Sequence, residues 1–316
     1  MRRFFLERLV GLVAVLFAVS IVVFILGSLI PGDLATVLAG VDGASEEQYQ
    51  AIRDELGLND PMIVQYGRWL GGIVRGDFGT SPITGRQVST DLSRQIPVSL
   101  QLTGFGLLLS TLLGVPLGIV AAVRANKSID IAIRAVLLIV FSVPVFIIGV
   151  FLVLATSRWF GSLYTSIYVP LSESPTGFAR SMFLPVLTIT VPLAAMTMQM
   201  TRASMLEALN EPHILTANAK GAKRWSILYI HALKNALQPV VTLLGFQFGI
   251  LLGGLFVVEE IFSLPGLGRG LLVAIGQRDY PLVMATTMVF AFFFVLANVV
   301  VDFLYPILDP RQRTAS

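Results

Sequence analysis

Long uncharged stretches alternate with short charged ones along the whole sequence. Six intervals of at least about 20 residues contain no Lys, Arg, Asp or Glu, and that length of apolar chain lets a helix cross the hydrocarbon of a bilayer. An ionisable side chain at the middle of such a helix costs about 2.5–3.5 kcal/mol, so charges mark the ends of spans. The pattern predicts six membrane-spanning helices, within residues 9–32, 95–123, 135–157, 181–201, 235–258 and 280–301.

The composition agrees with this pattern. Of the 316 residues, 55% are hydrophobic and only 13% are charged, with a mean hydropathy of +0.81, whereas soluble domains carry about a quarter charged residues. There is no cysteine, which excludes disulfides and thiolate metal sites. The first interval resembles a secretory signal peptide. Its uncharged run exceeds the roughly 7–15 residues of such peptides and ends without a small-residue cleavage site, so we expect an uncleaved span.

Prolines and one short interval modify the spans. Proline removes a backbone hydrogen bond and kinks a helix, and four prolines fall inside predicted spans: Pro116, Pro144, Pro185 and Pro192. The uncharged interval from Trp159 to Ser172 is short and rich in Ser, Thr and Tyr. It is more typical of an interfacial or re-entrant segment than of a seventh span.

The charges indicate the sidedness of the chain. Six spans place both termini on one side, and that side carries 13 of the 22 Lys and Arg residues but only 6 of the 19 Asp and Glu residues. By the positive-inside rule, we expect both termini in the cytoplasm.

The spans define one expected domain over residues 1–316. It comprises an N-terminal span (1–32), an extracytoplasmic loop (33–94) and a five-span core (95–316) that includes a cytoplasmic loop (202–234). We therefore expect an all-α integral membrane protein with an extracytoplasmic helical loop.

Two helices are expected in the extracytoplasmic loop. Ser45 and Gln48 have the spacing of a capping box, and the dipeptide at 60–61, Asp-Pro, can start a second helix. In the second segment, apolar side chains recur at helical spacing: Met62, Tyr66, Trp69 and Ile73. This stripe favours a lid or scaffold packed on the membrane surface, and a ligand site is the alternative.

The cytoplasmic loop contains a second pair of helical segments. Residues 203–209 favour helix, residues 210–212 break it, and residues 213–220 favour helix again. Gly221 then permits a turn before a further helical segment, 223–237. The pattern predicts a short helix, bent sharply at its end, at the base of the protein.

This short helix has the composition of a contact surface. Small side chains at Ala217 and Ala219 allow another backbone to approach closely, and Lys220, Lys223 and Arg224 can meet acidic groups or lipid phosphates. From the residues alone, docking of a partner and contact with membrane lipid both stay open.

The same loop carries a recognisable motif. The stretches "LTANAKG" and "HALKNALQP" resemble the cytoplasmic loop of ABC importer permeases of the dipeptide, oligopeptide and nickel family. The general permease signature has E-A-A where this chain has Leu215-Thr216-Ala217, and I-x-L-P where it has residues 231–234. Those departures are typical of the peptide branch. Further likeness lies in "GDFG" at 76–79, in "VEEIFSLPGLGRG" at 258–270 and in "YPILDPRQR" at 305–313. The order of these motifs is similar to that of the first permease of such systems, which has the longer outer loop.

The resemblance implies a type I ABC importer permease in a bacterial cytoplasmic membrane. Its partners would be a second related permease, two ATPase subunits and an extracytoplasmic substrate-binding protein. Di- or oligopeptides are the implied substrate, and nickel or glutathione is the alternative within the family. ATP and Mg would bind the ATPase partners, with no cofactor in this chain. The implied ATPase-coupling residues are Leu215, Thr216, Ala217, Ala219, Lys220, Gly221, Lys223 and Arg224.

Several other functions lack the residues that they require. There is no P-loop motif for ATP, and no hydrolase motif supports an enzyme. His213 and His231 have no cysteine partners, so no metal site is expected. Nothing indicates a nucleic-acid partner. The span centres carry no ionisable residue, which argues against a secondary carrier, although a carrier or channel remains the alternative from another class.

Two further sets of candidates complete the prediction. Neutral polar and soft side chains are expected to line a translocation path, namely Thr197, Met198, Thr242 and Gln247. A second set flanks two glycine-rich turns, which either cap an outer gate and meet the binding protein or are ordinary interfacial turns. This set is Asp77, Phe78, Glu259, Pro265, Gly266, Arg278 and Asp279.

Overall fold

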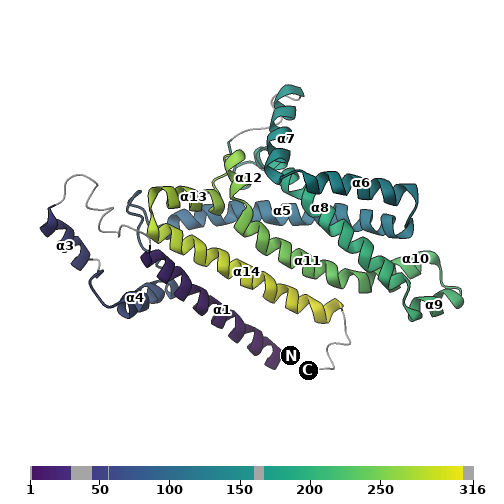
Figure 1. Cartoon of the computed structure of the whole chain (residues 1–316), viewed down its shortest axis with the longest axis horizontal. Helices are drawn as coiled ribbons and strands as arrows, with labels where there is room; N and C mark the ends of the chain where they lie inside the picture. Colours follow the sequence, from purple (N-terminus) through teal and green to yellow (C-terminus); the bar gives the residue numbers. More distant parts are fainter. Residues whose placement is uncertain (1, 30–44, 56, 160–166, 309–316) are drawn as a thin grey trace. The chain divides into compact units, whose positions relative to one another are not determined.

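The computed structural model describes residues 2–29, 45–55, 57–159 and 167–308 (Figure 1). In these ranges the regular structure is helical, apart from one β-bridge between Thr80 and Gln87. The helices are α1 (Arg2–Leu29), α3 (Glu46–Glu55), α4 (Met62–Val74), α5 (Val88–Val123), α6 (Ser128–Ser142), α7 (Val145–Trp159), α8 (Pro175–Leu209), α9 (Pro212–Ala219), α10 (Arg224–Ser226), the π-helix η2 (Ile227–Ala232), α11 (Leu233–Gly254), α12 (Phe256–Ile261), α13 (Leu267–Gln277) and α14 (Tyr280–Leu308).

The chain divides into two compact units, which are described separately. Unit 1 contains Leu100–Leu264 and Leu296–Ser316, together with Met1. Unit 2 contains Arg2–Ser99 and Pro265–Val295. Helices α5 and α14 each begin in unit 2 and end in unit 1.

Five continuous helices are long and apolar enough to cross a membrane. They are α1 from Arg8, α5, α8, the continuous run Arg224–Gly254 and α14 as far as Phe303. The remaining predicted span, 135–157, is a pair of shorter helices, α6 and α7, bent by 97° where they meet. The described residues thus hold five spans, or six if the bent pair counts as one.

The bend between α6 and α7 has a local cause. Pro144 has no N–H to donate, and a proline disfavours helical backbone at the residue before it. Val143 accordingly has φ −101° and ψ 118°, which is extended. The expected kink at Pro144 is therefore a complete break. By contrast, α8 continues through Pro185 and Pro192, and α5 continues through Pro116.

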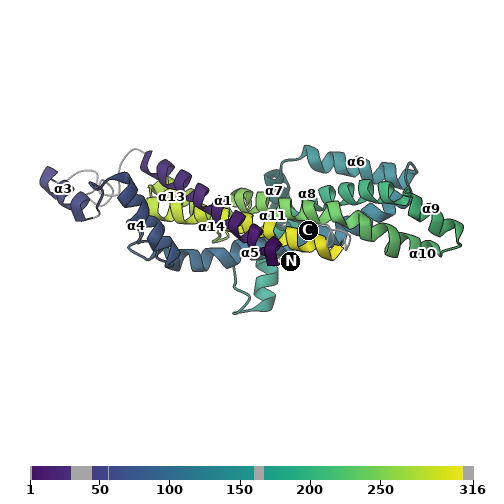
Figure 2. The same cartoon turned by 90° about the horizontal axis from the view of Figure 1, so that it is seen from below.

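Unit 1 is built around α8. Helix α11 runs alongside it (Figures 1 and 2), and α5 packs against it through glycines. A Cβ on Gly114 would lie 2.8 Å from Thr197 Cβ, and one on Gly118 would lie 2.6 Å from Thr201 Cβ. The spacing Gly114-x-x-x-Gly118 is the small-residue pattern that lets membrane helices approach closely.

In unit 2, α4 packs on α1 through the predicted stripe. The Tyr66 hydroxyl lies 2.8 Å from the Ser20 hydroxyl, and the Phe24 ring is 5.4 Å from Tyr66 and 5.6 Å from Trp69 between centroids. Met62 at the start of the stripe stays 55% exposed. The helix is therefore packed on α1 through the middle of the stripe, at Tyr66 and Trp69.

Both predicted helix starts in the loop between the first two spans are confirmed. The Ser45 N–H donates to Gln48 Oε1 at 3.0 Å, and the Gln48 N–H donates to Ser45 Oγ at 3.3 Å, which is the reciprocal pattern of a capping box. Helix α4 begins directly after Pro61. The rest of the predicted loop before Ser45, at 33–44, lies outside the described residues, as do 160–166 of the predicted interfacial segment.

Alanine at Gly114 should loosen the contact between α5 and α8. The added Cβ would lie 2.9 Å from the Ala194 carbonyl oxygen and 3.0 Å from the Met198 backbone nitrogen, and overpacking of this kind costs about 1–3 kcal/mol. We expect a lower Tm for Gly114→Ala in thermal unfolding of the detergent-solubilised chain.

Gly104→Ala is the matched control on the same helix. No atom lies within 4 Å of a Cβ at Gly104, and alanine has the higher helix propensity. Its Tm should equal or exceed that of the natural chain. Equal Tm values for the two variants would contradict the close approach of α5 to α8.

Candidate functional site

Helix α9 forms the short, bent element that the sequence predicts. Helix α8 ends at Leu209, and after Asn210 and Glu211 helix α9 begins at Pro212. Proline suits a first helical position because its missing N–H has no partner there in any case. Past the end of α9, Gly221 has φ +77°, in the left-handed region that glycine adopts without strain. The predicted break at 210–212 and the predicted turn at Gly221 are both confirmed.

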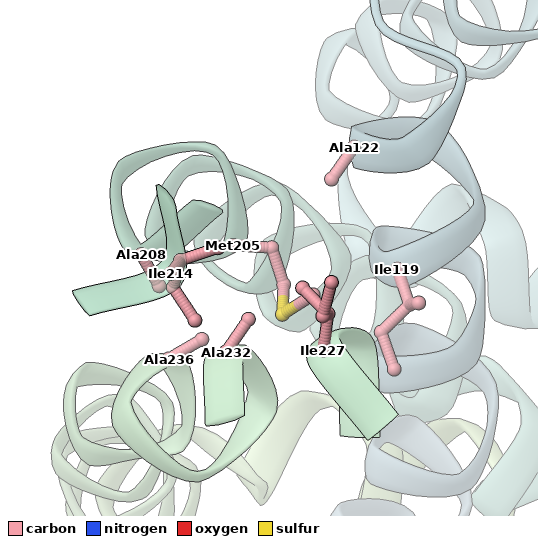
Figure 3. Packing of buried hydrophobic residues seen from close by; sticks show 8 residues of the cluster. All are labelled: Ile119, Ala122, Met205, Ala208, Ile214, Ile227, Ala232 and Ala236. Carbon is pink, nitrogen blue, oxygen red and sulfur yellow. The ribbon is translucent and has the colours of Figure 1, made fainter. Parts of the chain in front are cut away.

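A buried apolar cluster holds α9 in place (Figure 3). Ile214 of α9 is 4% exposed, and it belongs to a cluster with Ile119 and Ala122 of α5, Met205 and Ala208 of α8, Ile227 and Ala232 of η2, and Ala236 of α11. Burial of a side chain of this size contributes about 1.5–3 kcal/mol. One side chain of α9 thus attaches it to four other elements of unit 1.

Exposed residues lie on α9 and on the basic turn that follows it. Thr216 and Ala219 are exposed, as are Lys220, Lys223 and Arg224. The Thr216 hydroxyl donates to the Pro212 carbonyl oxygen at 3.0 Å, so it is directed back along the helix. A Cβ on Gly221 would meet no atom within 4 Å. The side chains of Leu215 and Ala217, also predicted here, lie outside the described residues.

A π-helical turn, η2, continues from this site into α11. The i→i+5 hydrogen bonds of a π-helix bring residues five apart to one side, and Ile227 and Ala232 are both buried in the cluster around Ile214. In an α-helix, with 3.6 residues per turn, residues five apart point to different sides. Hydrophobic periodicity at 3.6 residues contains no signal for such a turn, so the sequence does not predict it.

In unit 2, the two glycine-rich turns lie next to each other. The Ser81 hydroxyl donates to the Asp279 carboxylate, and the Leu282 N–H donates to the same group at 3.3 Å. Phe78 packs on a buried cluster of Val88, Leu92, Leu267, Ala274, Leu282, Ala285 and Val289. The Ser99 hydroxyl accepts the Leu267 N–H at 2.8 Å, which fixes the start of α13 just after Pro265 and Gly266.

The charged members of this predicted set differ in exposure. Asp77 and Arg278 are exposed. Asp77 Oδ1 accepts the Gly79 N–H at 2.9 Å, which shapes the turn, and Arg278 ends α13 with φ 57°. Asp279 is only 1% exposed, and Glu259 of α12, in unit 1, is fully buried. Of the four charged residues in this predicted set, only Asp77 and Arg278 therefore have solvent-exposed side chains.

Three of the four predicted path residues are buried in unit 1. Thr197 and Met198 of α8 and Gln247 of α11 are at most 2% exposed. Gln247 Nε2 donates to the Leu193 carbonyl oxygen at 3.4 Å, which links the two helices. Thr242 is exposed, and its hydroxyl donates to the Gln238 carbonyl oxygen. The assignment of these four residues to a path stays a prediction.

One charged cluster was not anticipated. Asp130, at the start of α6, is fully buried and binds Arg202 of α8 with two hydrogen bonds. In the sequence, Asp130 is a single acidic residue flanked by Arg124, Lys127 and Arg134. That isolation is the sequence signal that could have indicated an ion pair. Among the described residues, no group of three His, Asp or Glu side chains is placed to hold a metal ion.

Comparison with known proteins gives the family. The model described as "Binding-protein-dependent transport system inner membrane component" matches residues 114–314, and the model of the corresponding N-terminal part matches residues 1–103. A probable peptide ABC transporter permease protein of Sinorhizobium fredii is 38% identical over 313 residues, covering 98% of this chain and 99% of that protein.

Two further relatives cover the whole length. A putative peptide transport system permease protein of Brucella abortus is 39% identical over 308 residues, with 98% of each chain covered. The glutathione transport system permease protein of Escherichia coli is 36% identical over 316 residues, with 99% of each chain covered. The resemblance and the all-helical importer fold expected from the sequence are confirmed: the chain belongs to the inner-membrane components of binding-protein-dependent transport systems, within the dipeptide, oligopeptide and nickel branch of ABC importer permeases.

Proposed function

We propose that this chain is the permease subunit of an ATP-driven importer of di- and oligopeptides. It forms half of the translocation pathway with a second, related permease. Two ATPase subunits bind ATP and Mg, and α9 transmits their movement to the spans. An extracytoplasmic binding protein delivers the substrate, and this chain performs no chemical reaction itself.

The attachment of α9 is the observation that carries this proposal. An isolated helix of eight residues is unstable in water, yet α9 is anchored by Ile214 to α5, α8, η2 and α11. The exposed turn after α9 and the start of α10 carry three basic residues, and no acidic residue lies between Pro212 and Ser226. A helix that is fixed to several spans and is followed by a basic turn is suited to receive force from an acidic groove on a partner.

The sidedness follows from the charge distribution. The positive-inside rule places α9 and both termini in the cytoplasm, where ATPase subunits have access to ATP. Asp77 and Arg278 then face the outside, where a binding protein docks. The chain is accordingly a multi-pass protein of a bacterial cytoplasmic membrane.

Peptides are the favoured substrate because relatives at 38% and 39% identity are named as peptide permeases. Glutathione, itself a small peptide, is the second candidate, since a glutathione permease is 36% identical over the same length. A carrier or channel would move substrate as this chain alone. Uptake into liposomes by the purified chain, without ATPase subunits, would therefore overturn the importer assignment.

Valine at Gly221 should uncouple the importer. An L-residue in the left-handed region costs about 1–2 kcal/mol, and a β-branched side chain raises that cost, so the turn relaxes and α9 changes direction. We expect ATP-driven peptide uptake by reconstituted Gly221→Val complex to fall severely, while the Tm of the chain stays within a few degrees of the natural value.

Gly221→Asn is the matched control for this experiment. Asparagine tolerates the left-handed conformation better than other non-glycine residues, and the space around Gly221 is open. This variant should retain most of the uptake. If Gly221→Val transports as well as Gly221→Asn, the turn does not orient α9 for coupling.

Charge reversal at Arg278 should weaken the response to the binding protein. The Arg278 side chain is exposed and unit 2 is packed beneath it, so Arg278→Glu changes surface charge more than folding. Stimulation of ATPase activity by substrate-loaded binding protein should decrease, and basal ATPase activity should not.

Asp77→Asn isolates the charge on the neighbouring turn. Its amide oxygen can still accept the Gly79 N–H, so the turn is preserved while the negative charge is lost. Its stimulation by loaded binding protein should fall below that of the natural complex. Full stimulation in both Arg278→Glu and Asp77→Asn would show that these turns do not meet the binding protein.

A further inference from the structure

A buried ion pair joins the start of α6 to the last third of α8. The Asp130 carboxylate is fully buried, and Arg202 binds both of its oxygens, with Nε 2.6 Å from Oδ1 and Nη2 2.7 Å from Oδ2. The Asn126 N–H, in the turn between α5 and α6, donates to Oδ2 at 2.9 Å. Asn126 has φ 60°, and this left-handed backbone directs its N–H toward the carboxylate.

The ion pair fixes the position of α6 relative to α8. A bidentate arginine–carboxylate pair is both charge-assisted and directional. Because the carboxylate is buried, separating the pair would leave an uncompensated charge inside the protein. Arg134 lies 3.8 Å from the same carboxylate and is about half exposed, so it is peripheral.

The ion pair lies near the end of α8 that leads to α9. Arg202 is about two turns before the end of α8, and α9 begins only three residues after α8 ends. None of the eight buried residues of the cluster around Ile214 comes from α6 or α7. That cluster therefore does not hold α6. Helix α6 lies alongside α8 (Figures 1 and 2), and Asp130 ties the two helices together.

Helix α7 also packs on α8, just past the bend. A Cβ on Gly149 of α7 would lie 3.3 Å from Thr188 Cγ2 of α8 and 3.4 Å from the Phe262 ring. The α6–α7 pair thus meets α8 twice, through the ion pair at one end and through close packing past the bend. With α6 fixed to α8 by the ion pair, a displacement of α8 reaches the bend at Pro144 through both helices of the pair.

We propose that Asp130 and Arg202 are positioning residues for transport, which make α6 move as one body with α8 when α9 is displaced. This inference rests on the proposed coupling function of α9. Without the pair, α8 can shift while α6 stays behind, so ATP is hydrolysed with less movement of the bent span and less substrate is carried.

The first test measures the number of substrate molecules moved per ATP hydrolysed by the reconstituted complex. Asp130→Asn removes the charge and keeps the size of the side chain, and Arg202→Lys keeps the charge and loses the bidentate contact. In both variants we expect the ratio to fall about fivefold or more, with ATPase activity retained. Arg134→Gln is the matched control and should leave the ratio unchanged.

The second test uses the absence of cysteine from the natural chain. Spin labels at Leu138→Cys on α6 and Ala203→Cys on α8, both exposed positions, report the distance between the helices in the purified chain. The distance distribution should be narrow, and it should broaden when Asp130→Asn is added.

The outcomes separate this inference from the proposed function. An unchanged transport ratio in Asp130→Asn and Arg202→Lys, or an unbroadened distance distribution, overturns the positioning role and leaves the importer assignment intact. A purely stabilising pair would lower Tm and complex yield without changing the ratio, and this result would also overturn it. A natural complex without ATP-driven uptake would overturn both, although the spin labels would still report whether the pair holds α6.

Discussion

The burial of Ile214 is the contact on which the rest of the account depends. Helix α9 is too short to persist alone, and its described side chains at Thr216 and Ala219 are exposed. Among its described side chains, Ile214 is the one that fixes its position, in the cluster with α5, α8, η2 and α11, and the glycine turn follows. A basic surface is useful for coupling only if it is held rigidly to the parts that must move.

The helices that hold α9 are themselves tightly fixed to one another. The α5–α8 approach at Gly114 and Gly118 leaves no room for a methyl group, and the Asp130–Arg202 pair fixes α6 to the same helix. Closely packed interiors transmit a displacement with little deformation. Under the proposed function, a force on α9 would therefore move α8 and the elements attached to it together.

Local signals in the sequence predicted local structure correctly. The capping box at Ser45, the start of α4 at Pro61 and the turn at Gly221 each depend on a few neighbouring residues, and the structure has all three. The features that were missed depend on partners far along the chain. Arg202 pairs with a residue 72 positions away, and Ser81 with one 198 positions away. The π-turn η2 and the full break at Pro144 were missed for another reason, because charge-free length and helical period do not distinguish them from a continuous span.

A cross-linking measurement tests the central claim most directly, namely that α9 seats against an ATPase subunit. Thr216 is exposed on α9, and the chain has no other cysteine, so Thr216→Cys can carry a single photoreactive label in the assembled complex. The account predicts that illumination yields a covalent adduct between this chain and the ATPase subunit. Labelling of lipid alone, with the ATPase subunits present and active, would contradict it.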